Sequence, residues 1–134
     1  MIYVQSFSFI HSPYNKHEVP TVLRYVFDCR PIKNPGRIPE MMELTGYDQK
    51  VIEYLQNETK MPEYLEALKV IIKIAVEEYL ASQERYGDIY IQFGCTGGRH
   101  RSVYLSNSIF EYIKTITKEN STLNHLRLEE LKLI

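Results

Sequence analysis

Residues 89–102 read Ile-Tyr-Ile-Gln-Phe-Gly-Cys-Thr-Gly-Gly-Arg-His-Arg-Ser. The opening Ile-Tyr-Ile-Gln-Phe has the length and composition of a strand in a sheet. The two glycines allow a tight turn, and the residues from Ser102 onward carry apolar side chains at helical spacing. A strand that turns through glycines into a helix is a building unit of α/β proteins, so this stretch predicts an α/β fold.

The turn between the predicted strand and helix has the properties of an anion-binding site. Its backbone N–H groups can point inward together, and the N-terminus of the helix adds unpaired donors and a partial positive charge. The candidate binding residues are Cys95, Thr96, Gly97, Gly98, Arg99, His100, Arg101 and Ser102. Guanidinium groups clamp phosphate oxygens, hydroxyls donate to them, and the thiol and imidazole offer a nucleophile and a titratable donor. We therefore expect a phosphate-binding loop.

A purely structural role for the same residues is the alternative. The glycines could serve only the turn, the arginines could be solvated, and Cys95 could be a small buried hydrophobe. We prefer the anion site because a simple turn gains nothing from so much positive charge at a helix N-terminus that is already positive.

The composition of the whole chain limits its class. It has 134 residues, 44% of them hydrophobic, and a formal net charge of −1. This is the size of one domain, and we expect residues 1–134 to form a single domain with its own core. The net charge argues against a generally basic nucleic-acid binder, although a local patch around Arg99, His100 and Arg101 is compatible with one.

The cysteines and apolar runs bear on the compartment. Cys29 and Cys95 are the two cysteines, and they form neither a paired CxxC metal motif nor a secreted disulfide framework. We therefore expect a reducing compartment, no metal and no cofactor. No apolar run reaches the length of a membrane span, and the first residues lack the pattern of a signal peptide, so we expect a cytoplasmic protein.

Hydrophobic periodicity predicts strands and helices along the chain. We expect strands over 2–10, 22–29 and 89–93, helices over 48–57, 62–85 and 102–118, and in the tail either an edge strand or a short helix. Pro62 suits the first turn of the longest helix, and Gly87 suits its C-terminal cap.

If the strands are parallel, their carboxyl ends bring polar side chains to one edge of the sheet, where open α/β sheets bind ligands. These side chains belong to His11, Asp28, Arg30 and Cys95. Asp28 could be an acid, an orienting partner of Arg30 or a polar strand end. We expect His17 and His125 to be ordinary surface or hydrogen-bonded histidines.

Several motifs, in order along the chain, carry a family resemblance. The run 94–103, Gly-Cys-Thr-Gly-Gly-Arg-His-Arg-Ser-Val, resembles the GCTGG-x-HRSV hallmark of the RapZ C-terminal domain of bacterial RNase adapter proteins. Residues 7–11 resemble the opening strand of that domain, residues 27–35 its FD-x-R…NP segment, and residues 38–48 its IPEL…LTG-x-D segment. The resemblance spans residues 2–128.

This resemblance implies a phosphate-binding α/β domain, a mostly parallel sheet flanked by helices in a three-layer sandwich related to part of phosphofructokinase. It implies that the ligand is glucosamine-6-phosphate. It implies a second partner, a small regulatory RNA that the domain presents to an endonuclease. It also implies a homo-oligomer with a regulatory role. Carried over by motif, the ligand site would contain Cys95, Thr96, Gly97, Gly98, His100, Arg101 and Ser102, surrounded by His11, Asp28, Arg30 and Asn34.

Two departures limit what this resemblance implies. The family's N-terminal nucleotide-binding domain and a GxxxxGK[ST] motif are absent from the 134 residues, so we expect no ATP or GTP binding by the P-loop route. The strongly basic end of the RNase adapter is replaced by residues 129–134, Glu-Glu-Leu-Lys-Leu-Ile. This argues against RNA binding and leaves phosphosugar binding as the main hypothesis.

The spacing from Cys95 to Arg101 also fits the C-x5-R-[ST] motif of cysteine-dependent phosphatases. In that chemistry a low-pKa thiolate attacks phosphorus, the loop and its arginine hold the phosphate, and an acid such as Asp28 protonates the leaving group. Such loops commonly have glycine where His100 stands and histidine where Gly94 stands. The phosphatase is therefore our alternative to a phosphosugar-binding regulatory domain.

Overall fold

The computed structural model describes residues 1–14 and 19–134, so His17 lies outside the described residues. Four strands form one sheet: β1 (Ile2–Ser8), β2 (Val22–Asp28), β3 (Asp88–Cys95) and β4 (Ser121–His125). Their order is β2-β3-β1-β4, and each neighbouring pair is parallel. The predicted α/β class with a parallel sheet is confirmed.

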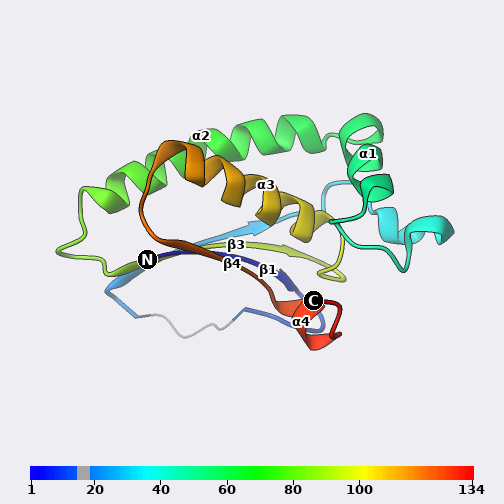
Figure 1. Ribbon diagram of the computed structural model, residues 1–134, viewed down its shortest axis with the longest axis horizontal. Coiled ribbons are helices and arrows are strands. Elements are labelled where there is room, and N and C mark those ends of the chain that lie inside the picture. The colour runs from blue at the N-terminus through cyan, green and yellow to red at the C-terminus, as the bar shows by residue number, and fades with distance from the viewer. Residues whose placement is uncertain (15–18) are drawn as a thin grey trace.

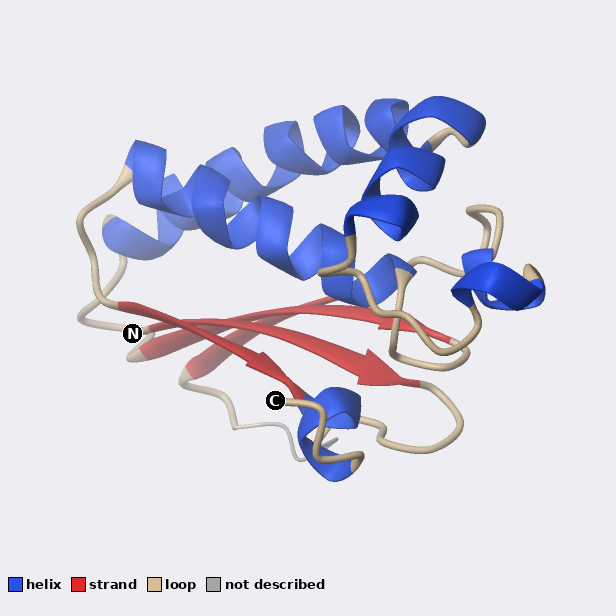
Figure 2. Ribbon diagram, turned by 45° about the vertical axis from the view of Figure 1, so that its right-hand side comes forward, coloured by secondary structure: helices blue, strands red, loops and turns tan. Residues whose placement is uncertain are grey.

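Helices flank this sheet (Figure 1). They are the short 3-10 helices η1 (Pro35–Arg37) and η2 (Pro39–Met41), then α1 (Gln49–Glu58), α2 (Met61–Leu80), α3 (Arg101–Ile116) and α4 (Leu126–Glu130). Figure 2 shows α1, α2 and α3 over one face of the sheet and α4 on the other side, near the carboxyl ends of the strands. Among the described residues, no helix combines the length and apolar character needed to cross a membrane.

The end of the longest helix differs most from the sequence prediction. The helix predicted over 62–85 ends at Leu80, because the Ala-Ser-Gln-Glu-Arg that follows has no large apolar side chain to extend the buried stripe. Gly87 therefore does not cap it, and its N–H donates instead to the Thr21 carbonyl. In the tail, both alternatives occur in succession, since β4 leads directly into α4.

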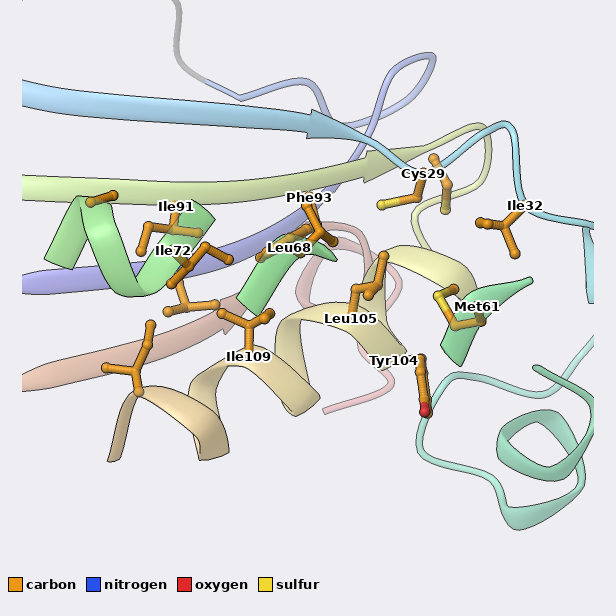
Figure 3. Close-up of a cluster of buried hydrophobic side chains, with 14 of the residues drawn as sticks. Cys29, Ile32, Met61, Leu68, Ile72, Ile91, Phe93, Tyr104, Leu105 and Ile109 are labelled. Atoms are coloured by element: carbon orange, nitrogen blue, oxygen red, sulfur yellow. The ribbon is translucent and has the colours of Figure 1, made fainter. Parts of the chain in front are cut away.

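The core lies between the sheet and the helices α2 and α3 (Figure 3). Alternate side chains of β1 and β3 are fully buried, among them Ile2, Val4, Ile91 and Phe93. The same buried cluster contains Leu68 and Ile72 of α2 and Leu105 and Ile109 of α3. Burying each such side chain contributes about 1.5–3 kcal/mol, so the sheet and the two helices stabilise one another.

The opposite face of the sheet is more polar. Tyr3 stacks on Tyr90 with ring centroids 4.5 Å apart, and Arg24 lies over the Tyr90 ring. Arg24 also donates to Gln92, and the Gln92 amide donates to Gln5. These aromatic and polar pairs can meet solvent. On this face the described part of the chain supplies one short helix, α4, as the third layer of the predicted sandwich.

Candidate functional site

The carboxyl ends of the strands meet at one edge of the sheet, as Figure 1 shows. In the register of the sheet, Ser8 at the end of β1 pairs with Cys95 at the end of β3. Asp28, the last residue of β2, pairs with Gly94. The segment 95–102, which we call the β3–α3 loop, starts at this edge and leads into α3. The convergence expected from parallel strands is therefore present.

The β3–α3 loop closes around the thiol of Cys95. The Gly98 N–H donates to Cys95 Sγ at 3.3 Å, and Sγ donates to Ser102 Oγ at 3.2 Å. Cys95 is 2% exposed and Ser102 is fully buried. The thiol thus ties the middle of the loop to the first turn of α3.

Gly98 is required by the backbone of this loop. Its φ of +67° lies in the left-handed region that side chains of L-residues disfavour. A Cβ there would also lie 2.9 Å from the backbone nitrogen of Ser8 and 2.9 Å from the Cβ of Arg127. The sequence predicted neither Ser8 nor Arg127 as a neighbour of the loop.

Ser8 joins the β3–α3 loop to the turn after β1. Its hydroxyl donates to the Thr96 carbonyl at 2.6 Å and accepts the backbone N–H groups of Ile10 and His11 at 3.2 and 2.9 Å. His11 is therefore anchored at this edge through its backbone, and the residue is exposed. The signal that could have identified Ser8 is its position as the last residue of a strand, opposite Cys95.

Arg99 and His100 hold the segment that precedes α1. Arg99 Nε donates to the Leu44 carbonyl at 3.1 Å, and His100 Nε2 lies 2.8 Å from the Met41 carbonyl oxygen. Burial lowers the pKa of His100, so its ring is neutral at neutral pH and donates one N–H to that carbonyl. Both side chains make contacts within the protein, and their expected contact with a ligand stays a prediction.

Gly46 packs directly against the start of α3. Its N–H donates to the Arg99 carbonyl at 2.9 Å. A Cβ at Gly46 would lie 2.6 Å from the His100 carbonyl oxygen and 2.6 Å from the Tyr104 nitrogen. Because both atoms belong to the backbone, they cannot move aside as a side chain could, and only glycine permits this approach.

Arg101 is buried and uses only part of its guanidinium within the protein. Nη1 donates to the carbonyls of Arg30 and Ile32 at 2.9 and 2.8 Å, and the residue is 4% exposed. Nε is buried and has no partner, and Nη2 donates to no described residue. The Nε and Nη2 hydrogens form the edge with which arginine binds carboxylate or phosphate in a bidentate manner. This edge can bind an anion.

Asp28, Arg30 and Asn34 lie beside the loop with their side chains engaged in local bonds. Arg30 forms a bidentate pair with Asp28 and stacks over the Phe9 ring at 4.1 Å. The hydrogen bonds from Arg30 lower the pKa of Asp28, which stays ionised at neutral pH. Asn34 caps η1, where its side chain accepts the Gly36 N–H at 2.8 Å. Their expected contact with a ligand stays a prediction.

The exposed part of the β3–α3 loop is its tip, formed by Thr96 and Gly97. Thr96 is exposed and Gly97 is partly exposed. A Cβ added at Gly97 would meet no atom within 4 Å, and its φ is outside the left-handed region. Neither packing nor backbone conformation explains why this residue is glycine. A ligand that approaches the backbone closely would explain it.

In the part of the chain that the structure describes, no three His, Cys, Asp or Glu side chains gather in a way that could hold a metal ion. A surface groove lies elsewhere, between residues 31–33 and the junction of α1 with α2. Its charged side chains are two lysines and two glutamates, Lys33, Lys60, Glu58 and Glu63, a balance that does not favour an anion.

Comparison with known proteins gives one family. Residues 1–129 match the family model described as the RapZ C-terminal domain. A nucleotide-binding protein of Petrotoga mobilis is 37% identical over 114 residues, which cover 85% of this chain and 39% of that protein. A nucleotide-binding protein of Thermotoga sp. (strain RQ2) is 37% identical over 99 residues, 74% of this chain and 34% of that protein. One from Clostridium acetobutylicum is 32% identical over 115 residues, 86% of this chain and 38% of that protein. The chain thus spans less than two-fifths of the length of these relatives.

Proposed function

The chain belongs to the RapZ C-terminal domain family, and on that basis we propose that it is a regulatory domain whose β3–α3 loop binds the phosphate group of a small phosphorylated molecule. The ligand class that we favour is a phosphosugar, and glucosamine-6-phosphate is the first candidate because the family resemblance implies it. The proposal treats residues 1–134 as one binding domain.

The observation that carries the proposal is the open space at Gly97. Three other glycines have their missing Cβ explained by close neighbours within the chain, namely Gly46, Gly94 and Gly98. Gly87 and Gly97 have no such neighbour, and of these two Gly97 stands at the exposed tip of a loop followed by a helix N-terminus. A phosphate that lies against this backbone would receive its N–H groups and would leave no room for a side chain.

Arg101 supplies the second argument. Its buried Nε has no partner and the residue forms no ion pair with a described carboxylate. A buried guanidinium donor without a partner is costly, and a phosphate oxygen would satisfy it through a charge-assisted hydrogen bond. The bonds from Nη1 to two carbonyls fix the group in place, so binding would require little ordering of the side chain.

A nucleotide is the second ligand class to test. The relatives described above are called nucleotide-binding proteins. This chain matches less than two-fifths of each, so the part that it does not match could account for that name. A nucleoside monophosphate offers the same phosphate group to the β3–α3 loop, and a direct comparison separates the two classes.

We propose binding in preference to phosphate-ester hydrolysis. The phosphatase mechanism needs a protonated acid for the leaving group, whereas hydrogen bonds from Arg30 hold Asp28 in its ionised form. It also needs an accessible thiolate, and Cys95 is buried with its sulfur bonded to Gly98 and Ser102.

RNA binding is not part of the proposal. Three of the arginines near the loop lie beside carboxylates, in the pairs Arg30 with Asp28, Arg99 with Glu43 and Arg127 with Glu130. Strong binding to a nucleic-acid backbone needs several free cations.

The test is calorimetric titration of the protein with glucosamine-6-phosphate, glucosamine, inorganic phosphate and a nucleoside monophosphate. The decisive variant is Gly97→Ala, with Gly87→Ala as its control, because a Cβ meets no atom within 4 Å at either position. Both variants should unfold at the wild-type temperature. Gly97→Ala should weaken phosphosugar binding by about tenfold or more, which corresponds to at least about 1.4 kcal/mol, and Gly87→Ala should not.

Each outcome has a clear meaning. Equal binding by both variants would move the site away from the loop. Tighter binding of the nucleoside monophosphate than of the phosphosugar would change the ligand class and leave the loop in place. Binding of unphosphorylated glucosamine as tightly as of its phosphate would contradict the proposal.

A further inference from the structure

A cluster of charged and hydroxyl side chains lies next to Gly98, on the side formed by α4 and the turn after β1. Arg127 of α4 is part of it, since the Cβ of Arg127 lies where a Gly98 side chain would begin. The guanidinium of Arg127 bonds to the carboxylate of Glu130, one turn further along the helix. The other oxygen of this carboxylate accepts the hydroxyl of Ser12 at 2.6 Å. The proposed phosphate site uses none of these contacts.

The turn after β1 fixes this cluster relative to the β3–α3 loop. Ser12 and Ser8 exchange backbone hydrogen bonds at 3.2 and 3.3 Å, and the Ser8 hydroxyl donates to the Thr96 carbonyl. The hydrogen bond from the Ser12 hydroxyl lowers the pKa of Glu130, which favours its charged form. A carboxylate held by one guanidinium nitrogen of Arg127 and by the Ser12 hydroxyl therefore lies beside a loop with the features of an anion site.

We propose that Arg127 and Ser12 form a second anion-binding position beside the β3–α3 loop, which the carboxylate of Glu130 fills when no ligand is bound. The inference rests on the proposed phosphate site and narrows its ligand class. A ligand with two anionic groups, such as a sugar bisphosphate, places one group on the loop and uses the other to displace Glu130. A ligand with one phosphate engages the loop alone.

The chemistry of the pair allows this exchange. Carboxylate and phosphate are both bound by the planar fork of arginine, so one can replace the other on Arg127. Glu130 is half-exposed, with a side-chain exposure of 51%, and it returns to solvent without becoming a buried unpaired charge. The Arg127 side chain is 18% exposed, so the pair is partly shielded from solvent, and an incoming phosphate has to replace the bonds that Arg127 and Ser12 make to Glu130. Glu130 is then an internal competitor that lowers affinity for the second anionic group.

Glucose 1,6-bisphosphate and glucose 6-phosphate are the probes for this proposal, titrated in parallel into the whole chain by calorimetry. In Glu130→Gln, the competing charge is gone and Arg127 is free. We expect the affinity for the bisphosphate to rise by about fivefold to tenfold, while the affinity for the monophosphate changes by less than about twofold. Arg127→Gln should remove the preference for the bisphosphate.

Glu129→Gln is the matched control, because it removes the same charge from the same helix at a residue outside the cluster. An equal gain in Glu129→Gln and Glu130→Gln would show a general effect of net charge and would overturn the proposal. An unchanged ratio of the two affinities in Glu130→Gln would overturn it as well. If glucose 6-phosphate binds and loses affinity in Gly97→Ala while the ratio stays constant, the second position fails and the phosphate site survives. If neither sugar phosphate binds, both fail.

Discussion

The tip and the base of the β3–α3 loop differ although their residues look alike in the sequence. At the tip, the Thr96 side chain is open to solvent and a Cβ at Gly97 would meet no atom, although the Thr96 carbonyl accepts the Ser8 hydroxyl. The base, residues 98–102, is tied by hydrogen bonds to Cys95 at the end of β3, to the segment 41–46 and to the segment after β2. Most of the side chains that suggested an anion site thus hold the loop in shape, and the surface left for a ligand is mainly backbone at the tip.

This difference shows how such a site can bind without rearranging. A loop whose base is fixed presents its N–H groups in one arrangement, so a ligand need not order it. The residues of the base also stabilise the fold. We therefore expect their substitution to change the free energy of unfolding more than it changes the affinity for a ligand. Four measurements test how far base and tip differ in their contribution to stability.

The largest effect is expected at Gly98, in the base. Gly98→Ala places a Cβ in the left-handed region and 2.9 Å from atoms of Ser8 and Arg127, so it should lower the free energy of unfolding by about 4 kcal/mol. Urea denaturation monitored by circular dichroism measures this. A loss no greater than that of Gly97→Ala would remove the distinction between the two glycines.

Acid should destabilise the protein through its buried histidines. Burial lowers the pKa of His125 from 6.5 to about 4, where its ring bonds to Ser6 and Asn107, and burial also lowers that of His100. The unfolded chain therefore binds protons that the folded chain does not. The stabilisation that these neutral rings provide is fully present above pH 6.5. The free energy of unfolding decreases as the pH falls toward 4, by roughly 2–3 kcal/mol through His125.

Denaturation curves between pH 7 and pH 4.5 measure this loss. His125→Gln should reduce the slope, and the lowered pKa of His100 should account for part of the slope that remains. Stability that rises as the pH falls from 6.5 would contradict the assignment of a neutral buried ring.

Substitution of Arg101 should lower the free energy of unfolding by less than substitution of Gly98. Arg101→Met keeps much of the buried volume but leaves the carbonyls of Arg30 and Ile32 without their donor, so we expect a loss of about 2 kcal/mol in the free energy of unfolding. Arg99→Met is the comparison, since that side chain lies nearer the surface and should cost less. A larger loss for Arg99→Met than for Arg101→Met would show that Arg99 stabilises the base more than Arg101 does.

The tip should show the smallest effect on stability. Thr96→Ala and Gly97→Ala should each change the free energy of unfolding by less than about 0.5 kcal/mol, because an exposed side chain and an unobstructed Cβ disturb no packing. The same denaturation assay measures both. A loss above 1 kcal/mol at either position would mean that the tip also belongs to the scaffold.

The sequence predicted the fold more completely than it predicted which residues of the loop hold it in shape and which are open to a ligand. Apolar periodicity located the strands and the longer helices, and the glycine turn located the loop, because these depend on local pattern. Whether Arg99 binds a ligand or the Leu44 carbonyl depends on a segment 55 residues away, which no local pattern contains. Ser8 and Arg127 were missed for the same reason, since each acts through a contact distant in the chain.

The position of β1 in the middle of the sheet determines when the site can form during folding. Ile2 pairs with Ile89 on one side and with Ser121 on the other, so β1 has no strand partner until most of the chain is available. Contacts of such long sequence separation make folding slow, because a large loop must close before the first strand pair forms. The bond from Ser8 to Thr96 spans 88 residues. A nascent chain released before residue 96 therefore lacks the proposed anion site entirely, and binding of a phosphorylated ligand there would report completed folding of the sheet.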